Sequence, residues 1–401
     1  KANNMGTANL TYPLKLPAGR NGLQPNLAIT YNSNNANGWM GLGWDINIPA
    51  ITIETRWGVP YYDENKESET YLLNGEQLAN KDNAYFYLPL THRAPWRDRV
   101  GDSLQFYPRV EGAFNRIIRY GDAPTNYYWV VTTTDGTRYF YGRKFNDDAV
   151  DTSSVLMDAN GNIAHWPLTE VRDMHDNFIR YEYVKEMQSG LPNGTILGQQ
   201  VYIKTIFYTG LKDKDGVHKV NFKLADTADY KRLDVIISAR NGLKEVTADV
   251  LDYVEIVSSD RPIRRYYMAY DTGAYAKTML CGFFETVPID TYGGWTDFES
   301  SPCTERCDIQ ITANILPYKF EYYTQPTEIF SENKLMINTV DQGPDVEVKL
   351  KFGKLQKTTA LGGTSSSSRS TGGAIVVGFG FNAFLKSLSV VCRSEERRVG
   401  K

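Results

Sequence analysis

The chain has 401 residues, of which 41% are hydrophobic and 13% aromatic, and its formal net charge is −3. This apolar content is enough for a sizeable packed core, which excludes a disordered chain. The small negative charge supplies no broad positive field, so we expect no nucleic-acid partner. No stretch approaches the roughly 18 apolar residues that span a bilayer, so we expect no membrane span.

The composition favours strands over helices. The sequence contains 27 Tyr and 17 Phe, which suit pleated, half-buried surfaces. Its 33 Gly and 17 Pro are spread along the chain and supply the breaks between many short strands.

Taken from the N-terminus, alternating apolar runs predict a first strand at 27–31 and a second at 46–53, broken by Pro49. The strongest hairpin signal is Asp135-Gly136 between two β-rich runs, because both turn residues accept a positive φ. Further strands are predicted at 127–132, 137–141, 178–184, 201–208, 218–224, 264–270, 318–323 and 345–352.

Helix signals are few. Residues 247–257 fit either a short helix or a strand. Strands and turns follow one another without the βαβ alternation of a parallel sheet. The sequence therefore predicts an all-β fold of extended antiparallel sheets with few short helices.

Two segments resemble each other, at 134–142 and 171–183. Each reads as a turn that leads into a strand with two Tyr on one face, Tyr139 and Tyr141 in the first copy. Stacked units of this kind would build an extended sheet, but coincidence in a Tyr-rich chain explains two copies equally well.

The composition changes near residue 356. We predict a scaffold domain over 1–355, a Gly/Ser-rich linker over 356–373 and the start of another β module over 374–392. The charged segment 393–401 has no apolar pattern and is predicted to be a non-native tail.

No motif carries recognisable chemistry. The four His lack metal-ligand spacing, and Gly-x-Ser-x-Gly is absent. Cys303 and Cys307 could form a local disulfide, or one of them could pair with Cys281, and zinc is disfavoured because no second paired cluster exists. We expect no cofactor, no metal and no catalytic residue.

Three other candidates have a structural interpretation. Gly38-x-x-Gly41-x-Gly43 has the wrong spacing for phosphate binding, so Gly41 and Gly43 are expected to serve tight backbone turns. Asp158 begins a calcium-like segment in which the Gly comes too early, which favours an Asn-Gly turn. The pair Glu67 and Glu69 and the basic stretch at 93–99 are interpreted as solvated loops.

An ordered series of motifs runs from residue 5 to about 355. It includes Arg20-Asn21-Gly22-Leu23-Gln24-Pro25 and Gly41-Leu42-Gly43-Trp44. Its marker residues are Gly19, Arg20, Gly22, Leu23, Gln24, Pro25, Tyr31, Asn32, Gly41, Gly43, Trp44, Gly136, Tyr139 and Tyr141. The series resembles the SpvB-like N-terminal domain family, which also opens the B components of insecticidal toxin complexes. Ala18 and Asn21 depart from the family pattern without affecting the resemblance.

The resemblance implies a structural region of a secreted bacterial toxin, within an RHS-type β shell around a toxic C-terminal segment. Its implied partners are RHS repeats, other toxin-complex components and the toxic cargo. The expected location is extracellular, or the bacterial cytoplasm before export. The alternative is a surface β module that binds carbohydrate or a receptor, which exposure of Trp39, Trp57 and Trp96 would favour. An enzyme is the least favoured hypothesis, because no motif has the required spacing.

Overall fold

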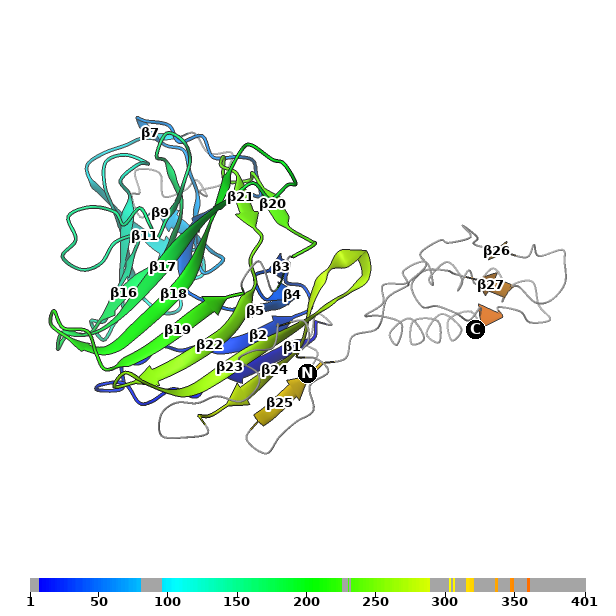
Figure 1. Cartoon of the computed structure of the whole chain (residues 1–401). Helices are drawn as coiled ribbons and strands as arrows, with labels where there is room; N and C mark the ends of the chain where they lie inside the picture. Colours follow the sequence, from blue (N-terminus) through cyan, green and yellow to red (C-terminus); the bar gives the residue numbers. More distant parts are fainter. Residues whose placement is uncertain are drawn as a thin grey trace, which may run out of the picture. The chain divides into compact units, whose positions relative to one another are not determined.

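The computed structural model (Figure 1) describes residues 7–80, 96–225, 230, 232–288, 303, 306 and 315–320, and the strand segments 336–337, 347–349 and 359–360. The chain divides into two units, residues 1–270 with 278–318 and residues 271–277 with 319–401. Strands dominate the described residues, in which the 3-10 turn η1, Ala274–Ala276, is a short helical segment. The predicted all-β, antiparallel fold is confirmed.

The strands are short in the N-terminal part and longer after residue 160. Those before it are β1 Asn9–Pro13, β2 Ala28–Asn32, β3 Asn37–Gly38, β4 Gly41–Leu42, β5 Trp44–Ile46, β6 Ala50–Ile53, β7 Lys66–Glu67, β8 Tyr71–Leu73, β9 Glu76–Asn80, β10 Arg97–Asp98, β11 Ser103–Pro108, β12 Arg116–Tyr120, β13 Tyr128–Thr132, β14 Arg138–Tyr141 and β15 Leu156–Met157. Those after it are β16 Ile163–Arg172, β17 Asn177–Gln188, β18 Gly198–Leu211, β19 His218–Leu224, β20 Ile236–Ser238, β21 Glu245–Thr247, β22 Leu251–Ser258, β23 Arg261–Thr272, β24 Thr278–Thr286, β25 Ile315–Lys319, β26 Met336–Ile337, β27 Glu347–Lys349 and β28 Thr359–Ala360.

Part of the first unit is a closed ring of antiparallel strands. The pairing runs β6–β8–β9–β11–β12–β13–β14–β16 and returns to β6. Strand β16 closes the ring because its second half pairs with β14 while His165, Trp166 and Pro167 pair with β6. A closed ring leaves none of these strands at an open edge.

Aromatic side chains form the core associated with this ring. The Trp129 ring lies 4.8 Å from Tyr71, 5.0 Å from Phe106 and 6.0 Å from Trp166, measured between centroids. The Trp166 indole N–H donates to the backbone oxygen of Tyr127 at 2.6 Å, so its polar atom is paired despite complete burial.

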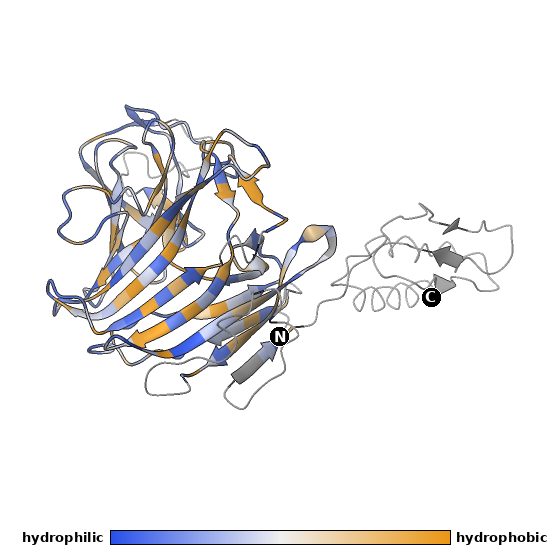
Figure 2. Cartoon of the chain, in the orientation of Figure 1, coloured by the Kyte–Doolittle hydropathy of each residue, from blue (hydrophilic) through white to orange (hydrophobic). Residues whose placement is uncertain are grey.

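A second sheet continues from β16 through β17, β18, β19, β22 and β23. Apolar and polar bands alternate across these strands (Figure 2). In β19, Val220 and Phe222 are buried and Lys223 is exposed, which is the period-two pattern of a sheet with two different faces. The strands predicted at 178–184, 201–208, 218–224 and 264–270 all lie here, and residues 251–258 form a strand rather than the alternative helix.

Three turns share one geometry. In the two that begin at Asp158 and Asp173, the carboxylate Oδ1 accepts two backbone N–H groups, and Oδ2 accepts the side-chain amide of the Asn four residues on. The turn 133–137 has the same pair of backbone hydrogen bonds as these two. The Asn-Gly turn predicted at 158–162 is confirmed, and the two similar segments noted in the sequence do share a turn.

The N-terminal strands form a small sheet, β1–β2–β5, that contacts the second sheet. The Tyr12 ring lies 4.9 Å from Phe283 and 6.2 Å from Tyr266. Beside them, the buried carboxylate of Glu285 pairs with Lys15 at 2.8 Å and with Arg264 at 2.9 Å. This ion cluster links the N-terminal sheet to β23 and β24.

Acid is expected to weaken this link. Burial opposes ionisation of Glu285, but the hydrogen bonds from Lys15 and Tyr12 and the charges of Lys15 and Arg264 lower its pKa overall. A lowered folded-state pKa gives stability that is fully present above the unfolded value of about 4.3 and is lost as the pH falls through the folded value. We therefore expect the free energy of unfolding, measured with guanidinium chloride, to fall less between pH 7 and pH 3 in Glu285→Gln than in the natural chain. An equal fall in the free energy of unfolding in the two proteins would contradict the stabilising role of the ionised Glu285.

Several expectations concern residues outside the described ranges. They are the linker at 356–373 apart from β28, the module at 374–392, the tail at 393–401 and most of the strand at 345–352, of which β27 is described. The domain boundaries at 355, 373 and 392 stay predictions.

Candidate functional site

The marker residues from the opening of the chain form a tight turn. Backbone N–H groups of Gly22 and Leu23 donate to the carbonyls of Gly19 and Arg20, and Gly19 N donates to the side chain of Gln24 at 3.1 Å. A Cβ on Gly19 would lie 1.9 Å from the Leu23 oxygen, so the chain approaches itself too closely for a side chain. These contacts fit the expected structural role of the turn, which stays a prediction.

A second group surrounds the Gly-rich segment. Gly41 and Gly43 have φ of 84° and 82°, so both occupy the left-handed region, as their expected turn role requires. The Tyr31 ring stands over Gly43 and lies 5.0 Å from the Trp44 ring. Asn32 N donates to the Gly43 oxygen at 2.9 Å.

The last marker residues lie in a different place. Gly136 has φ of 83° in the hairpin between β13 and β14, and Tyr139 and Tyr141 stand opposite Val131 and Trp129. The marker residues therefore lie in three separate places in the fold, and the structure does not gather them into one site.

A cavity of about 700 Å³ lies between the N-terminal strands and β16, β17 and β18. Its aromatic lining comes from Trp39, Trp44, Tyr183 and Tyr202. Its polar lining includes Thr30, Asn35, Asn37, Asp45, Asn47, His165, Gln200 and Thr247. Sequence reasoning did not predict it, because its walls come from segments separated by more than a hundred residues.

Burial disfavours the charged forms of two titratable groups in the cavity, Asp45 and His165. Burial raises the pKa of Asp45, although the hydrogen bond from the Trp39 indole N–H, 2.9 Å long, acts in the opposite direction. Burial also lowers the pKa of His165 to about 4, so its imidazole is neutral at pH 7.

A buried polar cluster braces one wall of the cavity. Arg232 donates to the Gly38 oxygen at 2.7 Å and to Asp234 at 2.8 Å. Asp234 also accepts from Asn37 at 2.6 Å and from the Thr278 backbone at 2.8 Å. Sequence reasoning missed Arg232 and Asp234, for which the only available signal was a pair of opposite charges two residues apart.

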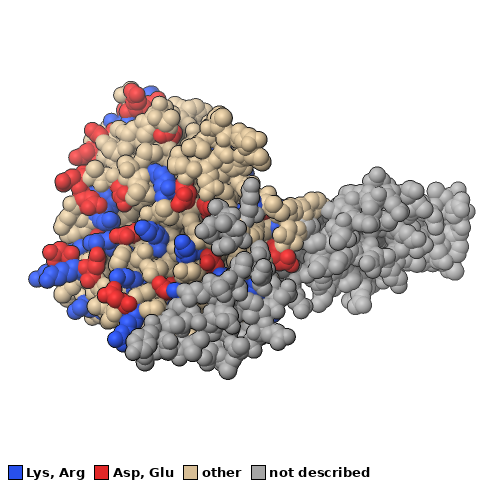
Figure 3. Space-filling model, viewed as in Figure 1, with Lys and Arg blue, Asp and Glu red and all other residues tan. Residues whose placement is uncertain are grey.

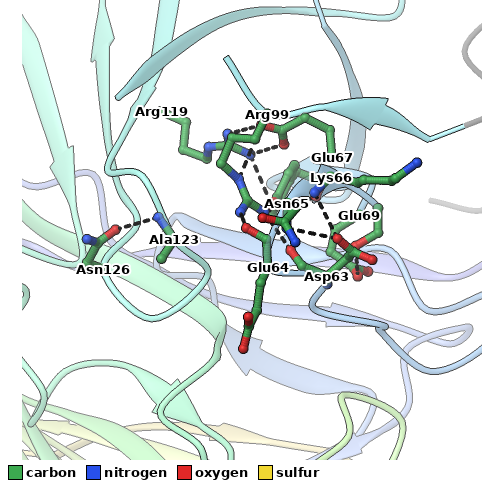
Figure 4. Close-up of polar contacts among 12 residues, drawn as sticks. Asp63, Glu64, Asn65, Lys66, Glu67, Glu69, Arg99, Arg119, Ala123 and Asn126 are labelled. Carbon is green, nitrogen blue, oxygen red and sulfur yellow. Dashed lines mark hydrogen bonds and ion pairs between the residues drawn. The ribbon is translucent and has the colours of Figure 1, made fainter. Parts of the chain in front are cut away.

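The interpretation of Glu67 and Glu69 as solvated side chains is wrong (Figure 4). Both Glu67 oxygens accept from Arg119, at 2.6 and 2.7 Å. Glu69 Oε1 accepts the backbone N–H groups of Tyr61 and Tyr62, both at 2.8 Å. Both oxygens of Glu67 and one oxygen of Glu69 therefore hold the chain around residues 61–69 together.

In the basic stretch the interpretation as a solvated loop is wrong for Arg99, whereas Trp96 and Asp98 are exposed. Arg99 is largely buried and donates to the backbone oxygens of Asp63, Glu64 and Lys66 (Figure 4). Arg119 lies over the Tyr127 ring, 3.8 Å from its centroid. The guanidinium groups of Arg99 and Arg119 bind the segment that contains residues 63–67 instead of pointing into solvent.

The structure also decides between the disulfide alternatives for Cys303. Cys281 is disulfide-bonded, whereas Cys303 is a buried thiol outside any disulfide. A local bond between Cys303 and Cys307 is therefore excluded, because Cys303 keeps its thiol. Among the described residues, no three His, Cys, Asp or Glu side chains gather where they could hold a metal ion.

The described surface mixes both signs of charge. Lys and Arg side chains alternate with Asp and Glu over the visible face, and no broad field of one sign forms there (Figure 3). Within the described residues, no helix has the length and apolar content needed to cross a membrane.

Comparisons with known proteins extend these observations. Mono(ADP-ribosyl)transferase SpvB of Salmonella typhimurium is 25% identical over 189 residues, which are 45% of this chain. The match spans only 30% of that relative's length. The SpvB protein of Salmonella choleraesuis strain SC-B67 matches to the same extent.

Solved structures share the fold. The N-terminal domain of effector protein SpvB from Salmonella typhimurium strain LT2 aligns with a TM-score of 0.56 at 20% identity, over 69% of this chain and 98% of that domain. The crystal structure of TcdB2-TccC3 aligns with a TM-score of 0.58 at 18% identity, over 86% of this chain and 18% of that one. The Photorhabdus luminescens Tc holotoxin pore aligns with a TM-score of 0.57 at 16% identity, over 90% of this chain and 19% of that one.

The family model described as Salmonella virulence plasmid 65kDa B protein matches residues 2–236, more than half of the chain. The ordered motifs and the fold agree with that match. The chain therefore belongs to the SpvB family.

Proposed function

We propose that this chain is a non-catalytic structural section of a secreted bacterial toxin-complex protein of the RHS type. It contributes sheet surface to a β shell that surrounds a toxic C-terminal segment. Its partners are RHS repeats and other toxin-complex components, in the same chain or in partner chains, and the cargo.

The observation that carries the proposal is the shared fold with TcdB2-TccC3, which extends over 86% of this chain but only 18% of that one. A domain that is a small part of a larger assembly needs surfaces for its neighbours. The continuous sheet from β17 to β23 offers such a surface, with polar and apolar faces along long strands. The Glu67 carboxylate, whose two oxygens both accept from Arg119, suits a structural role.

The test is electron microscopy of the full-length gene product that contains this chain. We expect a hollow shell in which residues 1–355 form part of the wall and in which the C-terminal segment resists added protease. The matched control lacks residues 1–355, and we expect an open shell with a protease-sensitive C-terminal segment. A compact particle without an internal space, or equal protease sensitivity in both proteins, would overturn the proposal.

A second candidate, a surface module that binds carbohydrate or a receptor, is favoured by one observation. The side chains of Trp57 and Trp96 are 60% and 39% exposed, and the Trp96 ring lies 4.6 Å from the exposed Tyr61 ring. Trp39 is partly buried and lines the cavity instead. Exposed aromatic rings are common anchors for ligands.

A further inference from the structure

The cavity beside β16, β17 and β18 has no part in a shell wall. A wall section needs sheet surface and strand edges, whereas this space is a cavity lined by both polar and apolar side chains. Its volume of about 700 Å³ falls in the range of small-molecule sites. The contacts among Arg232, Asp234, Asn37 and Gly38 fix one wall before any ligand arrives, which reduces the ordering cost of binding.

The lining disfavours charged ligands. Among the described residues that line this cavity, Asp45 is the one that can carry a formal charge at neutral pH, and none is a Lys or an Arg. Phosphate, sulfate or carboxylate groups would therefore find no cation to pair with. A cationic ligand would depend on Asp45, whose ionised form is disfavoured by burial.

The uncharged groups of the lining suit hydroxyl groups. Asn35 and Asn47 are exposed at the cavity, and amide side chains both donate and accept hydrogen bonds. Gln200 Nε2 donates to the Thr247 hydroxyl at 2.7 Å, which fixes the orientation of that amide. A ligand with several hydroxyl groups could exchange hydrogen bonds with this set.

Two neighbouring aromatic rings, those of Trp39 and Tyr202, belong to the lining. The bond from the Trp39 indole N–H to Asp45 holds the ring, which lies 6.0 Å from the Tyr202 ring at an interplanar angle of 33°. An indole face attracts the C–H face of a ligand through dispersion and exclusion of water. Sugar rings combine one such apolar face with a hydroxyl-bearing edge.

We propose that this cavity binds an uncharged saccharide of about two sugar units, a size set by the volume range of such sites. One sugar ring packs on Trp39, and hydroxyl groups bond to Asn35 and Gln200. The inference does not depend on the shell function. It gives the carbohydrate-binding activity of the second candidate a site in the cavity rather than at the exposed Trp57.

The test uses the full chain on an array of neutral and acidic glycans, followed by calorimetric titration of the glycans that bind. We expect binding to neutral glycans, reduced at least tenfold in Trp39→Ala and several-fold in Asn35→Ala, which removes an exposed side chain without disturbing the core. Asp45→Asn should keep binding, because the asparagine oxygen can still accept the indole N–H. Trp57→Ala is the matched control and should bind normally. Thermal unfolding of each variant confirms that it is folded.

Three outcomes would overturn the assignment. The first is a folded chain that binds no glycan on the array. The second is a preference for sialylated or sulfated glycans. The third is that Trp57→Ala loses binding while Asn35→Ala binds as well as the natural chain. That result would place the activity at the exposed aromatic rings. None of these outcomes bears on the shell, which microscopy tests separately.

Discussion

Replacing Arg119 with Met is expected to destabilise the first unit by about 3–5 kcal/mol, the usual result when one partner of a buried ion pair is removed. The Arg119 side chain is 2% exposed, and its partner Glu67 is 14% exposed. Methionine roughly preserves the side-chain volume but removes the nearer cation of the Glu67 carboxylate, which then keeps only Arg99 at 3.7 Å in a largely buried place. The stacking of the guanidinium on Tyr127 is lost as well. The change should appear as a lower guanidinium midpoint in unfolding followed by tryptophan fluorescence.

A double variant separates charge from packing. Adding Glu67→Gln to Arg119→Met removes the under-compensated carboxylate charge and should recover part of the lost stability. The exposed pair of Lys219 and Asp260 is the matched control, and Lys219→Met there should change stability by no more than about 1 kcal/mol. An Arg119→Met variant as stable as the natural chain would show that the buried pair does not hold the loop.

Replacing Gly41 with Ala is the second large effect that we expect, at about 2–5 kcal/mol. The left-handed φ of 84° costs an L-residue about 1–2 kcal/mol. The new Cβ would also lie 2.7 Å from the Thr278 backbone oxygen, and relieving such an overlap typically costs about 1–3 kcal/mol. Because Thr278 begins β24, the substitution should loosen the contact between the N-terminal hairpin β3–β4 and that strand.

Gly22 provides the matched control for Gly41. Its φ is 79°, close to that of Gly41, but a Cβ there would meet nothing within 4 Å. Gly22→Ala should therefore show only the backbone cost of about 1–2 kcal/mol. The difference between the two variants measures the overlap with Thr278. Equal losses in both would mean that the chain adjusts around Gly41 at no cost.

The sequence by itself determined the features that depend on neighbouring residues. Asp135-Gly136 correctly located the β13–β14 hairpin, but its turn spans residues 133–137 and only Gly136 takes a positive φ, so the expectation of two positive-φ turn residues was wrong. Alternation of apolar and polar residues located the long strands, since each side chain in a strand points away from the previous one. The ordered motifs identified the family, as the family match confirms.

Only the tertiary structure decided which polar groups are buried and what surrounds them. Glu67 looked solvated in the sequence because its partner Arg119 is 52 residues away, and no local pattern reports that pairing. The ring closes through β16, whose two halves pair with strands from opposite ends of the ring, and such pairing depends on the folded path of the chain. The cavity exists for the same reason. Trp39, His165 and Gln200 reach it from three distant segments, and burial at their meeting point sets the pKa of His165.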